Sequence, residues 1–210
     1  MWMNIDNYIE LHSSEEPDLL KQLNRETHVQ MVNPRMLSGH IQGRILKMIS
    51  SMIQAKRVLE LGTFTGYSAL CLAEGMPDDG TLHTIEINDE LEEFTQGFFS
   101  QSPHGKKIKQ HIGNALEIIH SLDETFDLVF IDADKREYLE YYQAVFNKVK
   151  KGGYILADNT LWDGKVIEAV DPNDKQTIGV MAFNEFVAKD KRVETVILPL
   201  RDGLTLIRKK

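Results

Sequence analysis

The stretch RVLELGTFTGYSALCLAEG, residues 57–75, decides the fold of this chain. It begins with a short apolar run typical of a buried parallel strand, passes through a glycine-bounded loop at residues 62–66, and continues into an apolar helix. Two further apolar runs also end in acids: FIDADK at residues 130–135 and ILADN at residues 155–159. Open α/β sheets bind ligands at the carboxyl ends of their strands, so we expect the three acidic clusters to face one crevice.

Apolar runs along the chain predict seven strands, and helical patterns fill the gaps between the first five. Residues 135–150 show the helical pattern best, followed by Gly152-Gly153 as a stop. Alternation of strand and helix predicts a parallel, doubly wound α/β sheet with helices on both faces. The strands are expected near residues 57–62, 82–88, 108–113, 127–133, 154–158, 194–200 and 204–208, and the predicted face of the helix carries Tyr138, Leu139, Tyr142, Val145, Phe146 and Val149.

The end of the chain departs from this alternation. Only Arg201-Asp202-Gly203 separates the last two expected strands, which is too short for the crossover that a parallel pair requires. The last strand must therefore run antiparallel to its neighbour. A mostly parallel sheet closed by a reversed strand is typical of the Rossmann-like class I methyltransferases, whereas the sheet of dinucleotide-binding dehydrogenases is parallel throughout.

At 210 residues and without a linker or repeat, the chain is expected to form a single domain, 1–210. Residues 55–210 would be its Rossmann-like core, and residues 1–54 a helical cap with turn formers at Asn33-Pro34 and Ser38-Gly39. The cap either closes the crevice or packs against the edge of the sheet. Residues 1–12 lack the apolar core of a leader, and no run is long enough to span a bilayer, so we expect a cytoplasmic protein without membrane contact.

Composition narrows the possible partners. The net charge is −8 and the pI is near 5.4, which argues against a broad basic surface for nucleic acid. Lys106, Lys107 and Lys109 form a local basic cluster that is either a solvated loop or a nucleic-acid contact. The only cysteine, Cys71, lies in an apolar helical stretch and is expected to be a buried structural thiol. The histidines show no paired metal spacing and are interpreted as non-ligands.

The first glycine loop indicates the cofactor. Its GxxxG spacing differs from the GxGxxG of dinucleotide-binding folds, and the preceding Glu60 would repel a pyrophosphate. A carboxylate at that place suits the ammonium and sulfonium of S-adenosylmethionine better than NAD. Glu86 ends the second strand, where a carboxylate can accept both ribose hydroxyls. The end of the third strand, Gly113-Asn114-Ala115, could flank the adenine, although Asn114 is also a good helix N-cap.

The other two acidic clusters indicate a metal. Asp132 ends the fourth strand and Asp158-Asn159 ends the fifth, so three oxygen ligands should converge. Such a set favours Mg²⁺, Mn²⁺ or Ca²⁺ over Zn²⁺, with Mg²⁺ the default. The competing interpretation is that these side chains only cap the helices that follow.

Residues next to this cluster could carry the chemistry. Asp134 and Lys135 follow Asp132 at the start of a helix, where the helix dipole and a nearby cation favour a neutral lysine able to act as a general base. A local ion pair is the alternative for Lys135. Trp162 lies on the loop after the expected metal ligands, where its indole could stack on an aromatic substrate or pack in the core.

Together these motifs resemble the cation-dependent O-methyltransferase family, which includes catechol and caffeoyl-CoA O-methyltransferases. The resemblance covers nearly the whole chain from about residue 17, and the stretch MVNPRMLSGHIQGRIL is similar to bacterial members. The motifs are ELGTFTGYSAL, TIEIN, GNALE, FIDADKREY, LADNTLWDG and LPLRDGLTLIRK.

The resemblance implies a role for each of these positions. Asp132, Asp158 and Asn159 would hold the divalent ion, and Lys135 would act as the base, with Asp132 close to the methyl end of the cofactor. The residues implied to surround S-adenosylmethionine are Ser38, Glu60, Gly62, Thr63, Ser68, Glu86, Ala115, Asp132 and Asp134.

The acceptor is the open question. Residues 171–186 read DPNDKQTIGVMAFNEF, unlike the Arg/Tyr-rich substrate stretch of the plant caffeoyl-CoA enzymes, which argues against a CoA ester. We therefore favour methyl transfer to one hydroxyl of a small aromatic diol of the catechol type. The alternatives are a tRNA hydroxyuridine O-methyltransferase, with Lys106, Lys107, Arg35 or Arg44 gripping phosphates, and a non-catalytic cofactor-binding protein. The resemblance also implies a homodimer, for which Met31, Met36, Met48 and Met52 are interface or core candidates.

Overall fold

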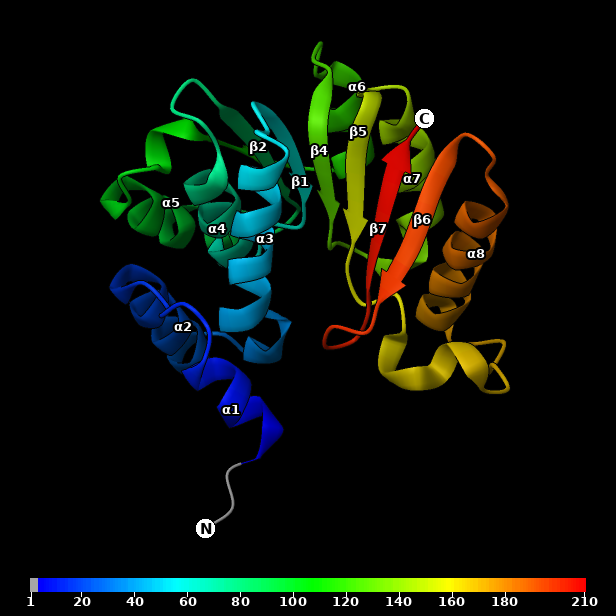
Figure 1. Cartoon of the computed structure of the whole chain (residues 1–210), viewed down its shortest axis with the longest axis horizontal. Coiled ribbons are helices and arrows are strands. Elements are labelled where there is room, and N and C mark those ends of the chain that lie inside the picture. The colour runs from blue at the N-terminus through cyan, green and yellow to red at the C-terminus, as the bar shows by residue number, and fades with distance from the viewer. Residues whose placement is uncertain (1–3) are drawn as a thin grey trace.

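A seven-stranded sheet of order β3-β2-β1-β4-β5-β7-β6 forms the centre of the computed structural model, which describes residues 4–210 (Figure 1). Strands β1 to β5 run parallel, and β7 pairs antiparallel with both β5 and β6. The strands are β1 (Arg57–Leu61), β2 (Thr81–Glu86), β3 (Ile108–Ile112), β4 (Phe126–Ile131), β5 (Val149–Ala157), β6 (Val193–Leu198) and β7 (Leu204–Lys209). This confirms the predicted sheet with its reversed last strand.

Helices cover both faces of the sheet because successive strand residues point to opposite sides. Val58 and Leu128 belong to a core that also includes residues of the N-terminal helices and of α4 and α5, whereas Leu59 and Val129 belong to a second core that includes residues of α6, α7 and α8. The helices after β1 are α4 (Tyr67–Gly75), α5 (Glu92–Gln101), α6 (Ala115–Ser121), α7 (Tyr138–Phe146) and α8 (Lys175–Lys189). The short 3₁₀ segments are η1 (Pro34–Met36), η2 (Asp89–Leu91), η3 (Gly105–Lys107), η4 (Lys135–Glu137) and η5 (Trp162–Ile167).

The predicted helix at residues 135–150 was too long and partly misoriented. It begins as η4 and ends at Phe146, and Val149 already belongs to β5. Gly152 and Gly153 therefore lie inside β5, where the pairing with β4 changes register, rather than stopping a helix. The buried face of α7 includes Tyr141 in place of Leu139, since Tyr138, Tyr141, Tyr142, Val145 and Phe146 follow helical spacing more closely.

The N-terminal segment forms α1 (Ile5–Leu11), α2 (Asp18–Gln30), η1 and α3 (His40–Met52). The predicted turn former Asn33-Pro34 begins η1, and Ser38-Gly39 lies between η1 and α3. Leu23 and Leu46 are buried in the core beside α4, so the cap packs on one face of the sheet and not against its edge. Sequence patterns did not predict α1, which extends away from the sheet (Figure 1). Residues 1–3 of the segment expected to lack a leader lie outside the described residues. No helix within residues 4–210 has the length and apolar character needed to cross a membrane.

Candidate active site

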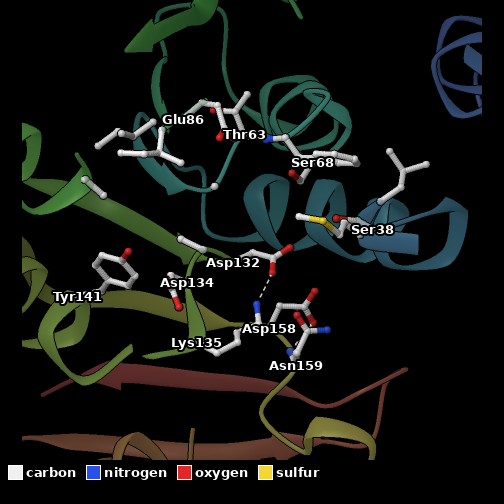
Figure 2. Close-up of a pocket in the computed structure, with 18 of the residues that line it drawn as sticks. Ser38, Thr63, Ser68, Glu86, Asp132, Asp134, Lys135, Tyr141, Asp158 and Asn159 are labelled. Carbon is white, nitrogen blue, oxygen red and sulfur yellow. Dashed lines mark hydrogen bonds and ion pairs between the residues drawn. The ribbon is translucent and has the colours of Figure 1, made fainter. Parts of the chain in front are cut away.

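The carboxyl ends of β1, β2, β4 and β5 open into a cavity of about 810 Å³, which the cap closes on one side. Figure 2 shows Asp132 between two groups of side chains: Thr63, Ser68 and Glu86 on one side, and Lys135, Asp158 and Asn159 on the other. Of the residues predicted from the sequence, those lining the cavity are Ser38, Gly62, Thr63, Ser68, Glu86, Ala115, Asp132, Asp134, Lys135, Asp158, Asn159 and Trp162. Glu60 does not line it.

Gly62 brings the ends of β1 and β4 into contact. Its φ is +97°, a conformation that favours glycine, and a Cβ built there would lie 2.1 Å from the main-chain oxygen of Asp132. Its N–H donates to the main-chain oxygen of Ile85 at 2.9 Å, which ties the loop to β2 as well. The glycine loop is therefore held close against the strand end that carries Asp132.

Backbone donors orient Glu86 at the cavity wall. Its Oε2 accepts the N–H of Phe64 at 2.8 Å, and its Oε1 accepts the N–H of Asn88 at 3.0 Å. Each carboxylate oxygen can accept a further hydrogen bond, so two neighbouring hydroxyl groups could bind here. Asn114 lines the same cavity and also caps α6 by accepting the N–H of Glu117 at 3.2 Å, so both interpretations of this residue fit its position.

Glu60 is fully buried beneath the cavity wall instead of facing the crevice, because its side chain points to the α4 side of the sheet. The Thr84 hydroxyl donates to its Oε2 at 2.5 Å, while its Oε1 has no hydrogen-bond partner among the described residues. Burial, together with the negative charges of Asp132 and Glu86, raises the pKa of Glu60 to about 8, although the neighbouring hydroxyls of Ser68 and Thr84 oppose that shift. A buried carboxyl group with one oxygen unpaired could be stabilised by a cationic ligand in the cavity.

Asp132 and Asp158 lie at the ends of adjacent parallel strands, as the sequence predicted. The pairing of Ile131 with Ala157 sets them side by side, and Asn159 follows with φ +55°. Burial and the neighbouring charge of Asp132 raise the pKa of Asp158 to about 6. No three His, Cys, Asp or Glu side chains of residues 4–210 cluster as metal ligands, so a site here needs the amide oxygen of Asn159. Two carboxylates and an amide suit a hard divalent cation.

Lys135 is held between an acid and a phenol. Its Nζ lies 2.8 Å from Oδ1 of Asp132 and 2.7 Å from the hydroxyl of Tyr138, which in turn donates to the main-chain oxygen of Asp158 at 3.0 Å. The ion pair expected as an alternative for Lys135 is thus present. The sequence predicted Tyr138 only as a residue of the apolar helix face. Its position three residues after Lys135 could have indicated a contact between the two side chains.

Asp134 and Trp162 also line the cavity. Asp134 accepts the N–H of Arg136 at 3.0 Å at the start of η4, and hydrogen bonds from the Arg136 guanidinium hold the pKa of the Asp134 carboxyl below its usual value. Trp162 has φ +49° and belongs to neither hydrophobic core. Its Nε1 is buried without a hydrogen-bond partner among the described residues, so the indole is available to a ligand.

Two basic residues named for phosphate contacts are engaged inside the protein. Lys107 is 4% exposed and donates to the main-chain oxygen of Met76 at 2.8 Å, so the basic cluster is not simply a solvated loop. Arg44 forms an ion pair with Glu74 at 2.7 Å. These two side chains are therefore not available to bind tRNA phosphates, and no observation favours the tRNA alternative. Cys71 is buried as expected, and burial raises the pKa of its thiol to about 12.

Known proteins resemble this chain along most of its length. A family model described as O-methyltransferase matches residues 10–210. The caffeoyl-CoA O-methyltransferase of Petroselinum crispum is 36% identical over 205 residues, covering 92% of this chain and 85% of the relative. Caffeoyl-CoA O-methyltransferase 5 of Nicotiana tabacum is 35% identical over 205 residues, with the same shares of 92% and 85%.

Solved structures show the same fold. The O-methyltransferase TomG of Streptomyces achromogenes, involved in tomaymycin synthesis and solved in complex with SAM, superposes with a TM-score of 0.92 at 30% identity, covering 98% of this chain and 96% of that one. The SAH-bound methyltransferase PaMTH1 of Podospora anserina gives a TM-score of 0.89 at 26% identity, covering 98% and 94%.

Proposed function

Because this chain belongs to the O-methyltransferase family, we propose that it transfers the methyl group of S-adenosylmethionine, with Mg²⁺ or another hard divalent ion, to one hydroxyl of a catechol-type small molecule. The observation that carries the proposal is the convergence of Asp132, Lys135, Asp158 and Asn159 in the cavity that Glu86 also lines. We infer that residues 1–210 act as one domain, since cap residues such as Ser38 line the same cavity as the core.

The glycine-loop side of the cavity fits S-adenosylmethionine. Glu86 offers both carboxylate oxygens to the vicinal hydroxyls of the ribose. Ala115, which follows β3 and lines the cavity, would contact the adenine. Ser68 would contact the amino-acid moiety. The buried Glu60, next to Ser68, would stabilise the positive charge of its ammonium group. Thr63, Gly62 and Asp134 complete the wall, with Asp132 nearest the methyl group. SAM and SAH in the related structures support this choice of cofactor.

The other side of the cavity fits the metal and the base. The ion would be held by Asp132, Asp158 and Asn159, and when bound it supplies Lewis acidity that favours loss of a proton from the acceptor hydroxyl. Lys135 takes that proton at Nζ, and Asp132 and Tyr138 hold the Nζ in place. The acceptor oxygen forms a bond to the methyl carbon as the carbon–sulfur bond breaks, which yields the methyl ether and S-adenosylhomocysteine. Alignment of the two reactants provides much of the rate enhancement.

A small aromatic diol fits the acceptor side. The indole of Trp162 offers an apolar face and a free N–H, and an oxygen-ligated cation binds two vicinal oxygens well. The caffeoyl group named for the plant relatives is itself a vicinal diol. The test compares turnover of catechols with turnover of phenols that have a single hydroxyl. We expect turnover only with catechols, and equal rates on both classes would refute the vicinal-diol requirement.

We also propose a homodimer. Helix α1 has no buried residue, and its apolar side chains Ile5 and Leu11 are each 69% exposed. Met48 and Met52 of α3 are exposed too, which makes them interface rather than core candidates. Burying these side chains against a second copy would remove apolar surface from water. Sedimentation should show a dimer whose dissociation is promoted by Ile5→Asp with Leu11→Asp, whereas a wild-type monomer at all concentrations would contradict it.

A further inference from the structure

Gln42 connects the cap directly to the proposed metal ligands. Its Nε2 lies 2.6 Å from Oδ2 of Asp158, and the residue is only 1% exposed. The other oxygen of Asp158, Oδ1, accepts the backbone N–H of Asn159 at 2.9 Å. Each oxygen of the Asp158 carboxylate therefore has one fixed donor, and together these donors set the plane of the carboxylate while leaving lone pairs free.

Arg201 determines which way the Gln42 amide faces. Its Nη1 lies 3.2 Å from Oε1 of Gln42 and also donates to the main-chain oxygen of Ser38. A guanidinium only donates hydrogen bonds and a carboxylate only accepts them, so the amide must turn its oxygen to Arg201 and its NH₂ to Asp158. Without Arg201 the amide can rotate, and in the flipped orientation its oxygen would face the carboxylate without a hydrogen bond.

The backbone conformation at Arg201 favours glycine, so the turn itself does not require an arginine. Arg201 lies in the turn between β6 and β7 with φ +48°, a left-handed conformation that favours glycine. The turn would form at least as well without the guanidinium. The contacts of the Arg201 side chain, rather than the shape of the turn, are therefore what this position supplies.

We propose that Gln42 and Arg201 are positioning residues for the metal ligand Asp158. Arg201 orients the Gln42 amide, and Gln42 holds the Asp158 carboxylate in the orientation that receives a divalent cation. Partners that hydrogen-bond to metal ligands commonly tune metal affinity in this way. The inference rests on the proposed function, since it assumes that Asp158 binds the metal. It adds that Gln42 of the cap and Arg201 of the turn between β6 and β7 complete the metal site.

The test measures Mn²⁺ binding to the full chain by isothermal titration calorimetry, without acceptor. Gln42→Met keeps the length of the side chain and removes both amide hydrogen bonds. We expect the Mn²⁺ dissociation constant to rise roughly 10-fold or more, with little change in S-adenosylmethionine affinity. Gln30→Met is the matched control, because Gln30 also lies in the cap but is exposed and donates to Glu26 at 2.8 Å, away from Asp158. The control should bind Mn²⁺ like the wild type.

A second variant tests the order of the contacts. Arg201→Gly removes the guanidinium and places the preferred residue in the turn, so it should fold while binding Mn²⁺ more weakly. Because Arg201 acts through Gln42, the double variant should lose no more Mn²⁺ affinity than Gln42→Met alone. A merely structural role would lower thermal stability without changing the Mn²⁺ dissociation constant. Additive losses in the double variant would refute the route through Gln42.

The outcomes separate this inference from the proposed function. Equal Mn²⁺ affinity in the wild type and both variants overturns the positioning role and leaves metal-dependent methyl transfer standing. A wild type that binds no Mn²⁺ overturns the metal-dependent function and, with it, this inference.

Discussion

The hydroxyl of Tyr138 lies 2.7 Å from Nζ of Lys135, deep in the protein, and it donates onward to the main-chain oxygen of Asp158. This phenol therefore links the proposed base to the backbone of a proposed metal ligand. Burial raises the pKa of Tyr138 well above its usual value, so the phenol stays protonated and keeps its donor.

Replacing this phenol should affect both stability and turnover. Tyr138→Phe removes the acceptor of Lys135 and leaves the buried Asp158 oxygen without its donor, which we expect to cost about 1–2 kcal/mol of unfolding free energy. Turnover should fall by roughly 10-fold through misplacement of Nζ, with little change in the KM for S-adenosylmethionine. Chemical denaturation and steady-state kinetics measure the two effects. An unchanged kcat would show that Tyr138 is only a packing residue.

Removing the proposed base should separate chemistry from cofactor binding. Lys135→Ala should lower kcat by about 100-fold or more while the S-adenosylmethionine dissociation constant changes little. The control is Lys151→Ala, since Lys151 is exposed on β5, and it should retain wild-type kinetics. If Lys135→Ala weakens cofactor binding as much as it slows turnover, Lys135 has a binding role instead.

The buried Glu60 should make stability depend on pH. Because its pKa is raised from 4.5 to about 8 in the folded protein, the folded state binds the Glu60 proton more tightly than the unfolded state. Its contribution to stability is therefore complete below pH 4.5 and is lost as the pH rises through 8. Glu60→Gln removes this ionisation, so the stability of the variant relative to the wild type should increase as pH rises, by roughly 5 kcal/mol near pH 9. Thermal melts of the protein without ligands test this; a pH-independent difference would contradict it.

The close approach at Gly62 should tolerate no side chain. Gly62→Ala places a Cβ 2.1 Å from the Asp132 oxygen in a left-handed conformation, so the loop must move. We expect a loss of about 1–3 kcal/mol in unfolding free energy and weaker binding of S-adenosylmethionine. Gly97→Ala is the control, because nothing lies within 4 Å of a Cβ there. Equal stability of the two variants would show that the loop is not constrained.

The sequence predicted the elements whose signal is local. The alternation of strands and helices predicted the parallel sheet, and the short link at Arg201-Asp202-Gly203 predicted the reversed last strand; both predictions are confirmed. The predicted site residues other than Glu60 line one cavity because parallel strand ends share an edge. Their roles in binding and catalysis stay predictions.

What the sequence did not predict depends on contacts between distant segments. Gln42 reaches Asp158 from the cap, and Arg201 reaches Gln42 from the hairpin, so no local pattern marks either of them. Glu60 was expected to face the cofactor, but the alternation of β1 turns it toward α4 and buries it. The boundary of α7 was misjudged because the glycine pair lies in an irregular part of β5.

The most direct test of the central claim measures transfer of the labelled methyl group from S-adenosylmethionine to 3,4-dihydroxybenzoate, with Mg²⁺ and again with EDTA. The account predicts transfer with Mg²⁺ and its loss in EDTA, restored by excess Mg²⁺. Equal transfer in EDTA, or no transfer to this or other catechols while the protein binds both S-adenosylmethionine and Mg²⁺, would contradict it.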